Sequence, residues 1–178
     1  MKIVELKLYS FNELSDEAKQ KALSDYNGDS EYFWGDEAMG SLKKFLEHFN
    51  CELIDWSLDF LEPHRNSYKI DIPEYMQEKT YDELKGYIEG MGKYDPETLK
   101  GLGSCMFTGV CFDESLGDGA RKEYYSGTTG ISDIIHAGIS EWEIDVKKDC
   151  EYNYSEECYA ETCESNEYLF TEEGQLWS

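Results

Sequence analysis

The segment from Asp36 to Asn50 repeats its apolar side chains every three or four residues, and this spacing constrains the fold more than any other feature of the chain. The apolar positions are Ala38, Met39, Leu42, Phe45, Leu46 and Phe49. Such spacing places them along one side of an α-helix. A helix with one continuous apolar side needs other elements to cover it, so we expect Phe45 to lie in a folded core.

The residues after this helix change to a period of two, which is typical of a β-strand. Ile54, Trp56, Leu58 and Phe60 alternate with Asp55, Ser57 and Asp59. We therefore expect a strand that buries Trp56 on one face and exposes acidic residues on the other. Tyr68, Ile70 and Ile72 repeat the alternation, and Pro73 ends it.

Other segments carry the start and stop signals of further elements. A helix is expected from Ser15 to Asn27-Gly28, and the capping box of Thr80 and Glu83 predicts a short helix. The remaining expectations, in chain order, are a strand over Lys2–Tyr9, a central strand over Ser104–Phe112, a break at Gly117-Asp118-Gly119, a helix from Ser132 to Trp142, a helix from Ser155 to Ser165 and a hairpin over Glu167–Trp177. Residues 143–146 fit either helix or strand. Together these segments predict a single α+β domain over residues 1–178, with three to five helices packed on a small, mainly antiparallel sheet.

The charge of the chain limits its partners. The sequence has 39 acidic and 16 basic residues, a net charge of −23, and the stretch from Asp149 to Ser178 has nine carboxylates and no Lys or Arg. Binding to nucleic acid or to an anionic membrane depends on Lys and Arg, so both kinds of partner are disfavoured. Aromatic residues make up 15% of the chain, which indicates a folded protein instead of a disordered acidic tail. A basic protein surface is the partner that such a charge favours.

The sequence has no apolar run close to the roughly 18 residues of a membrane span. The first nine residues also lack the apolar core of a signal peptide. We therefore expect a soluble, cytosolic protein.

The six cysteines are expected to be reduced. Three of them (Cys51, Cys105, Cys111) lie in apolar runs and three (Cys150, Cys158, Cys163) in the acidic C-terminal segment. No Cys-x-x-Cys pair occurs, and the histidines are scattered at His48, His64 and His136. A zinc site normally has closely paired ligands, so no metal or other cofactor is expected. A metal site and disulfides remain as alternatives.

Rows of carboxylates are the candidate partner-binding residues. Glu157, Glu161 and Glu164 share one face of the last expected helix, about 5–6 Å apart. The other candidates are Asp55 and Asp59, and Glu141, Glu143 and Asp145, which would lie about 6.5 Å apart along a strand. These separations are comparable to those of phosphates along one strand of a duplex. The alternative is that these carboxylates form a solvated acidic face.

No pattern in the sequence indicates catalysis. Asp113, Glu114 and Asp118 are expected in a glycine-containing loop, but they lack the order of ligands of an EF-hand. The segment Gly101–Cys105 is rich in glycine and lacks the lysine of a phosphate-binding loop. No Ser or Cys has an obvious base, so no catalytic residue is expected.

Three islands of sequence resemble a known family. They are Tyr9–Lys19, Leu46–Phe49 with Asp55–Ser57, and Asn166–Gly174. They resemble the start, middle and end of small acidic uncharacterised proteins encoded by tailed phages and prophages. The resemblance implies a phage or prophage origin and action in the host cytoplasm, and it brings no catalytic residues.

The sequence therefore favours a phage-encoded, non-enzymatic inhibitor. Its acidic surface would mimic DNA and occupy a basic nucleic-acid-binding surface of a host nuclease, as an anti-CRISPR or antirestriction protein. The alternative is an accessory enzyme or metal-binding protein that uses Cys, His and carboxylate residues. A structural role, as a homodimer or as a virion component, is a third possibility.

Overall fold

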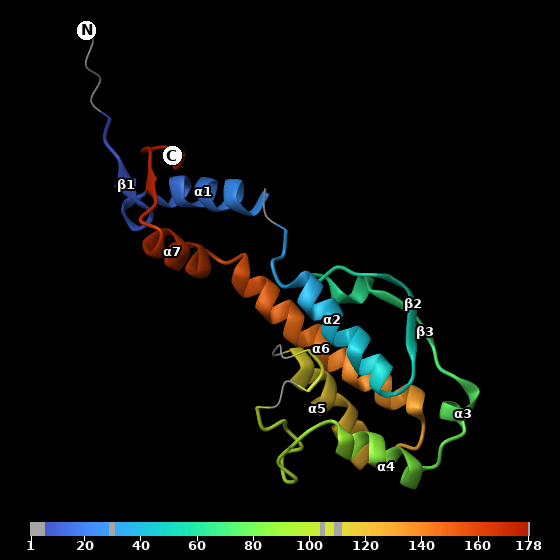
Figure 1. Ribbon diagram of the computed structural model, residues 1–178. Coiled ribbons are helices and arrows are strands. Elements are labelled where there is room, and N and C mark those ends of the chain that lie inside the picture. Colours follow the sequence, from blue (N-terminus) through green and yellow to red (C-terminus); the bar gives the residue numbers. More distant parts are fainter. Residues whose placement is uncertain (1–5, 29–30, 104–105, 109–111, 178) are drawn as a thin grey trace. The chain divides into compact units, whose positions relative to one another are not determined.

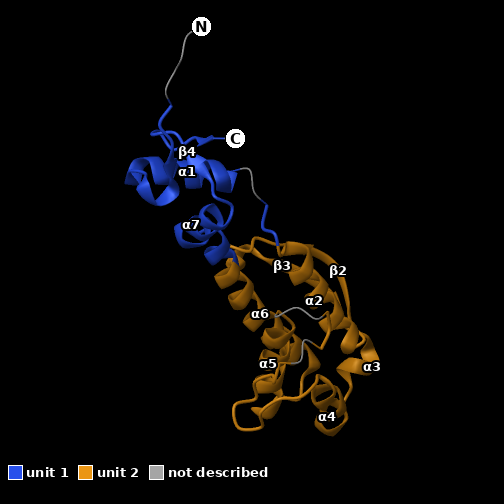
Figure 2. Cartoon of the chain, turned by 60° about the vertical axis from the view of Figure 1, so that its left-hand side comes forward, with its two compact units in different colours: residues 1–33, 150–178 blue, residues 34–149 orange. Residues whose placement is uncertain are grey.

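The computed structural model describes residues 6–28, 31–103, 106–108 and 112–177 (Figure 1). These residues form seven α-helices and two antiparallel sheets, which confirms the expected α+β class. They fall into two compact units, coloured in Figure 2: unit 1 comprises residues 1–33 and 150–178, and unit 2 comprises residues 34–149. Across the described ranges, we find no helix with the length and apolar character needed to cross a lipid bilayer.

Unit 2 contains most of the helices. Its elements are α2 (Gly35–His48), β2 (Glu52–Ser57), the 3-10 turn η2 (Pro63–Arg65), β3 (Ser67–Asp71), α3 (Glu74–Gln77), α4 (Tyr81–Gly90), α5 (Phe112–Tyr125) and most of α6 (Ile131–Asn153). The apolar stripe of α2 is buried as expected, and Leu42, Phe45 and Leu46 are wholly inaccessible to solvent. Helices α2 and α4 both pack against α5.

Helix α5 corrects the expected break in the chain. The glycines at Gly117 and Gly119 were expected to break the chain, but both lie inside α5. A Cβ atom at Gly119 would overlap the carbonyl oxygen of Ala137, and one at Gly138 would come within 2.8 Å of the carbonyl oxygen of Leu116. The glycines therefore allow two helix backbones to approach closely. In the sequence, a glycine with this role cannot be distinguished from one that ends a helix.

The expected central strand over Ser104–Phe112 is also absent from the part of it that the structure describes. Met106, Phe107 and Thr108 form no strand, and Phe112 begins α5. The remaining positions of this stretch lie outside the described residues. Of the described residues in this run only Phe112 is buried, and it is the first residue of α5.

The hairpin of β2 and β3 corrects the expected burial of Trp56, which is 43% exposed. The register between the strands shifts at Ile54. This bulge changes the phase of the alternation, so that Leu53 and Trp56 lie opposite Ile70 and Tyr68. Ile54 and Trp56 thus leave the common buried face that a strict period of two predicts.

Residues 143–146, which the sequence left open, belong to α6. Trp142 and Val146 are buried one turn apart on this helix, with 0% and 1% of their surface exposed. A spacing of four residues puts them on the same side of a helix, and this burial favours the helix over a strand.

Unit 1 combines helices with a three-stranded sheet. Its elements are β1 (Tyr9–Ser10), the 3-10 turn η1 (Phe11–Glu13), α1 (Asp16–Gly28), α7 (Glu156–Ser165), β4 (Leu169–Phe170) and β5 (Leu176–Trp177). The antiparallel sheet has the order β1-β4-β5, so the expected C-terminal hairpin is confirmed. Of the expected opening strand, Leu6–Leu8 are not in a strand, Tyr9 is in β1, and Lys2–Glu5 lie outside the described residues. Phe11, Tyr159 and Phe170 lie at the centre of a small core between η1, α7 and β4.

Candidate partner-binding surface

Helix α7 begins where the sequence predicts. The Ser155 hydroxyl accepts a hydrogen bond from the backbone N–H of Cys158 at 3.2 Å, which caps the helix. Glu156 and Glu157 occupy the first turn, where the positive end of the helix dipole stabilises carboxylates.

One side of α7 is buried and the other is acidic. Tyr159 and Cys163 are 3% and 2% exposed, and the Tyr159 ring lies edge-on to Phe11 at 5.1 Å between centroids. Glu157, Glu161 and Glu164 are all exposed, and helical geometry places them within an arc of about 60° on the opposite side. The expected carboxylate row is thus present on α7. Among the described residues, none of the three carboxylates forms an ion pair with Lys or Arg.

A tyrosine holds the middle carboxylate of this row. The Tyr152 hydroxyl donates a hydrogen bond to Glu161 at 2.9 Å, and this bond raises the pKa of Tyr152. Tyr152 is itself 44% exposed. The surface therefore offers aromatic area beside its charge, a mixture common at protein interfaces.

Asp55 and Asp59 do not form the expected strand row. Asp55 is exposed on β2, but Asp59 lies beyond the end of that strand. The Asp59 carboxylate accepts hydrogen bonds from the N–H groups of Leu61 and Glu62 at 3.1 and 3.0 Å and lies 3.8 Å from Arg65. Asp59 therefore stabilises a turn, because the chain leaves the strand before reaching it.

Glu141, Glu143 and Asp145 lie on α6, so their spacing is that of a helix and Glu143 faces a different side from the other two. Glu141 accepts a hydrogen bond from Lys122 at 2.8 Å, and Glu143 accepts one from Tyr68 at 2.5 Å. Asp145 is half-buried, and burial raises its pKa. These carboxylates interact mainly within unit 2 and do not form one exposed row.

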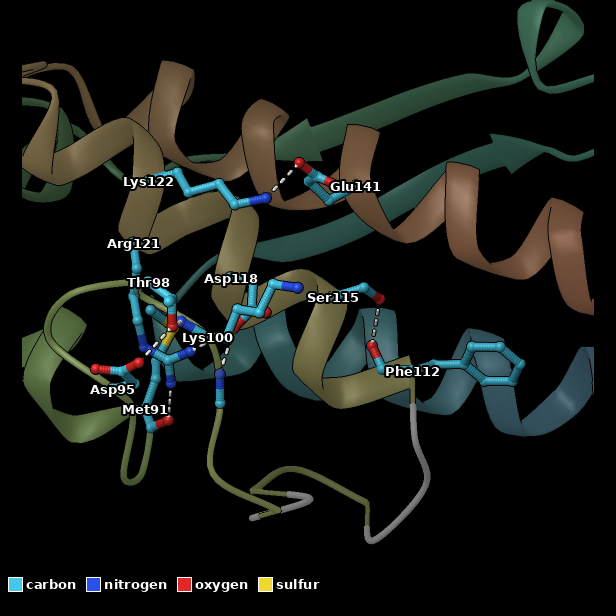
Figure 3. A network of polar contacts seen from close by, with 11 residues as sticks. Met91, Asp95, Thr98, Lys100, Phe112, Ser115, Asp118, Arg121, Lys122 and Glu141 are labelled. Atoms are coloured by element: carbon cyan, nitrogen blue, oxygen red, sulfur yellow. Dashed lines mark hydrogen bonds and ion pairs between the residues drawn. The ribbon is translucent and has the colours of Figure 1, made fainter.

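A buried charged cluster in unit 2 was not expected from the sequence (Figure 3). Arg121 is completely buried, and its guanidinium lies 3.0 Å from Asp118, which precedes it by one turn of α5. The guanidinium also donates a hydrogen bond to the carbonyl of Met91 and lies 5.0 Å from the centroid of the Tyr94 ring. Asp118 accepts a further hydrogen bond from the N–H of Gly101 at 2.8 Å. The cluster thus joins Met91 and Gly101, which lie between α4 and α5 in the sequence, to helix α5.

The spacing of Asp118 and Arg121 was the available signal for this cluster. It indicates an ion pair only if the segment is helical, and the glycines on either side of Asp118 indicated a break. Asp113, from the same expected acidic loop, is also buried on α5 and accepts N–H hydrogen bonds from Phe107 and Thr108 at 2.9 and 2.7 Å. These two carboxylates therefore stabilise backbone segments. Over the residues with described positions, no three His, Cys, Asp or Glu side chains gather in a way that could hold a metal ion.

The remaining candidate nucleophiles and bases are dispersed. The His48 ring donates a hydrogen bond to the carbonyl of Tyr87 at 2.7 Å, and His136 is exposed on α6. Cys51, Cys150 and Cys163 are buried and Cys158 is partly buried, whereas Cys105 and Cys111 lie outside the described residues. Burial raises the pKa of Cys51 to about 11, which disfavours the reactive thiolate.

No family model, curated protein or solved structure matches this chain.

Proposed function

We propose that this protein is a phage-encoded, non-enzymatic inhibitor that occupies a basic nucleic-acid-binding surface of a host CRISPR or restriction nuclease. The observation that carries the proposal is the row of Glu157, Glu161 and Glu164 on α7. Their exposure leaves their charge available to a partner, and among the described residues no Lys or Arg neutralises it.

The distribution of charge between the units supports this choice of surface. Unit 1 has fifteen acidic and four basic residues, and unit 2 has twenty-four acidic and twelve basic residues. The net charges are therefore −11 and −12, although unit 1 has little more than half the residues of unit 2. The electric field of a charged surface steers a partner of opposite charge towards it. Unit 1 has more negative charge per residue than unit 2 and should therefore attract a basic partner more strongly in proportion to its size.

The other candidate carboxylates contribute less to this surface. Glu141 is paired with Lys122, Glu143 holds Tyr68, and Asp59 stabilises a turn. A carboxylate that already accepts hydrogen bonds within its own unit must give them up before it can meet a partner, which costs free energy. The α7 row has no such cost at Glu157 and Glu164, for which the described residues show no side-chain hydrogen bond.

The test compares two variants against purified restriction and CRISPR nucleases. The first changes Glu157, Glu161 and Glu164 to Gln, which preserves side-chain size and helix propensity. The second changes Glu74, Glu78 and Glu97, which are exposed in unit 2, to Gln and serves as the control for net charge. We expect the α7 variant to lose about tenfold or more in association rate at low salt, and the control to lose much less. Equal losses, or no loss from the α7 variant, would contradict the proposal.

A further inference from the structure

A groove of about 350 Å³ opens in unit 1 beside the C-terminal end of α7. Six of the residues that line it carry the argument: Phe11, Ala160, Tyr168, Leu169, Glu164 and Glu167. The first four supply apolar surface and the last two supply carboxylates. Glu164 also belongs to the exposed row on α7, so the groove adjoins the surface that we propose for the partner.

The apolar wall of the groove is formed by residues that belong to the core of unit 1 or pack against it, together with Leu169. Phe11 is 2% exposed and belongs to the core of unit 1, and Ala160 and Tyr168 pack against that core. Leu169 on β4 is 42% exposed. Such a wall suits a narrow aliphatic chain, because methylene groups placed on it leave water and cover exposed apolar surface.

The charged side of the groove lies where the helix ends. Glu164 is in the last turn of α7, and the N–H of Glu167 bonds to the carbonyl of Glu164 at 3.2 Å. Both side chains are exposed, and the negative end of the helix dipole adds to their potential. The described residues provide neither carboxylate with an ion pair. Lys19, whose ammonium lies 5.8 Å from the centroid of the Phe11 ring, is not among the lining residues.

We infer that this groove binds one arginine side chain of the partner. The three methylene groups would lie on the wall formed by Ala160 and Leu169, and the guanidinium would lie between Glu164 and Glu167. Arginine suits the groove better than lysine because its planar guanidinium can bond two carboxylates at once and can stack on the Tyr168 ring. The inference rests on the proposed function, since a basic nucleic-acid-binding surface would supply the arginine.

The experiment titrates the full-length, nitrogen-15-labelled protein with n-butylguanidinium, a short aliphatic chain with the head group of arginine. We expect saturable shifts of the amide resonances of residues 160–169, with a dissociation constant in the millimolar range. Two control compounds separate the contributions. n-Butylurea has a similar shape without the charge, and guanidinium has the charge without the chain, and both should bind at least about fivefold more weakly.

Matched variants locate the binding. Glu164→Gln with Glu167→Gln should weaken binding of n-butylguanidinium by about tenfold. Glu172→Gln with Glu173→Gln removes the same charge from exposed positions between β4 and β5 and should weaken it less than about twofold. Retained dispersion of the amide resonances verifies that each variant is folded. Equal losses from the two variants, or shifts spread over the acidic residues of the whole chain, would show diffuse attraction and overturn the inference.

The outcomes for the groove and for the proposed function are distinguishable. If n-butylguanidinium does not bind residues 160–169 while the α7 variant still loses nuclease binding, the groove assignment is wrong and the proposed function stands. If n-butylguanidinium binds as expected but the protein binds no nuclease, the preference of the groove for arginine is established and the proposed function is wrong.

Discussion

The guanidinium of Arg121 and the carboxylate of Asp118 lie 3.0 Å apart on consecutive turns of α5, and Arg121 is completely buried. Burial lowers the pKa of Arg121, and the charge of Asp118 opposes that change. The pair also joins two segments of backbone, through the carbonyl of Met91 and the N–H of Gly101. We therefore expect the stability of unit 2 to depend on this buried charge.

Removal of this charge should destabilise the protein strongly. Arg121→Met keeps apolar volume but leaves Asp118 without its buried partner, and we expect a loss of about 3–5 kcal/mol in the free energy of unfolding. Urea denaturation measures it. Lys122→Met, at the exposed neighbouring position, should cost less than about 1 kcal/mol. A similar, small effect from both variants would show that the buried pair contributes little.

The glycines at the crossing of α5 and α6 should not tolerate alanine. Gly138→Ala would place a Cβ atom 2.6 Å from the Phe45 ring and 2.8 Å from the carbonyl of Leu116, and we expect a loss of about 1–3 kcal/mol. Gly86→Ala in α4 is the control, because the space around Gly86 is open. That variant should gain about 0.5–1 kcal/mol from helix propensity. Thermal and urea unfolding distinguish the two signs, and a gain at Gly138 would contradict the close approach of the helices.

Phe45 and Trp56 should differ sharply in their response to truncation. Phe45 is fully buried, so Phe45→Ala should cost about 3–5 kcal/mol through lost burial and the cavity left behind. Trp56 is 43% exposed, with the Lys43 ammonium 4.7 Å from its ring centroid, so Trp56→Ala should cost about 1 kcal/mol. Denaturation of both variants under the same conditions measures the difference. A cost at Trp56 as large as that at Phe45 would mean that the hairpin buries this ring.

Cys51 should make stability depend on alkaline pH. Its pKa is raised from 9.0 to about 11 in the folded protein, chiefly by burial, so between these values the unfolded chain loses a proton that the folded chain retains. The contribution of the thiol is therefore complete below pH 9 and is lost as the pH rises through 11. The stability difference between wild type and Cys51→Ala should change by up to about 1.4 kcal/mol per pH unit over that interval. Urea denaturation at several pH values measures it, and a constant difference would contradict the shift.

The purified protein should bind neither DNA nor RNA. Its net charge of −23 repels phosphates, and the basic residues of unit 1 are four lysines, Lys2, Lys7, Lys19 and Lys21, no two of which are adjacent in sequence. A gel-shift titration at about 0.15 M salt tests this directly. Submicromolar affinity would be incompatible with an acidic inhibitor that competes with nucleic acid.

Local signals predicted those elements whose residues depend mainly on their own neighbours in sequence. The stripe around Phe45 and the cap at Ser155 were correctly placed, because helical periodicity and capping operate over three or four residues. The carboxylates of α7 followed from the same periodicity. Their predicted row is present, whereas the row expected at Asp55 and Asp59 is not, since β2 ends before Asp59.

The sequence by itself determined the α+β class, the acidic character and the exposed row of α7, since composition and short-range spacing suffice for each. Only the tertiary structure decided the roles of Gly119 and Arg121 and the exposure of Trp56. The pattern around Gly119 indicates a break unless a second helix packs against it, and Arg121 is buried only because Met91 and Tyr94 lie beside it. The bulge at Ile54 changes the phase of the alternation in β2, and Trp56 is exposed. Each of these depends on contacts between segments distant in sequence, and no local pattern specifies such contacts.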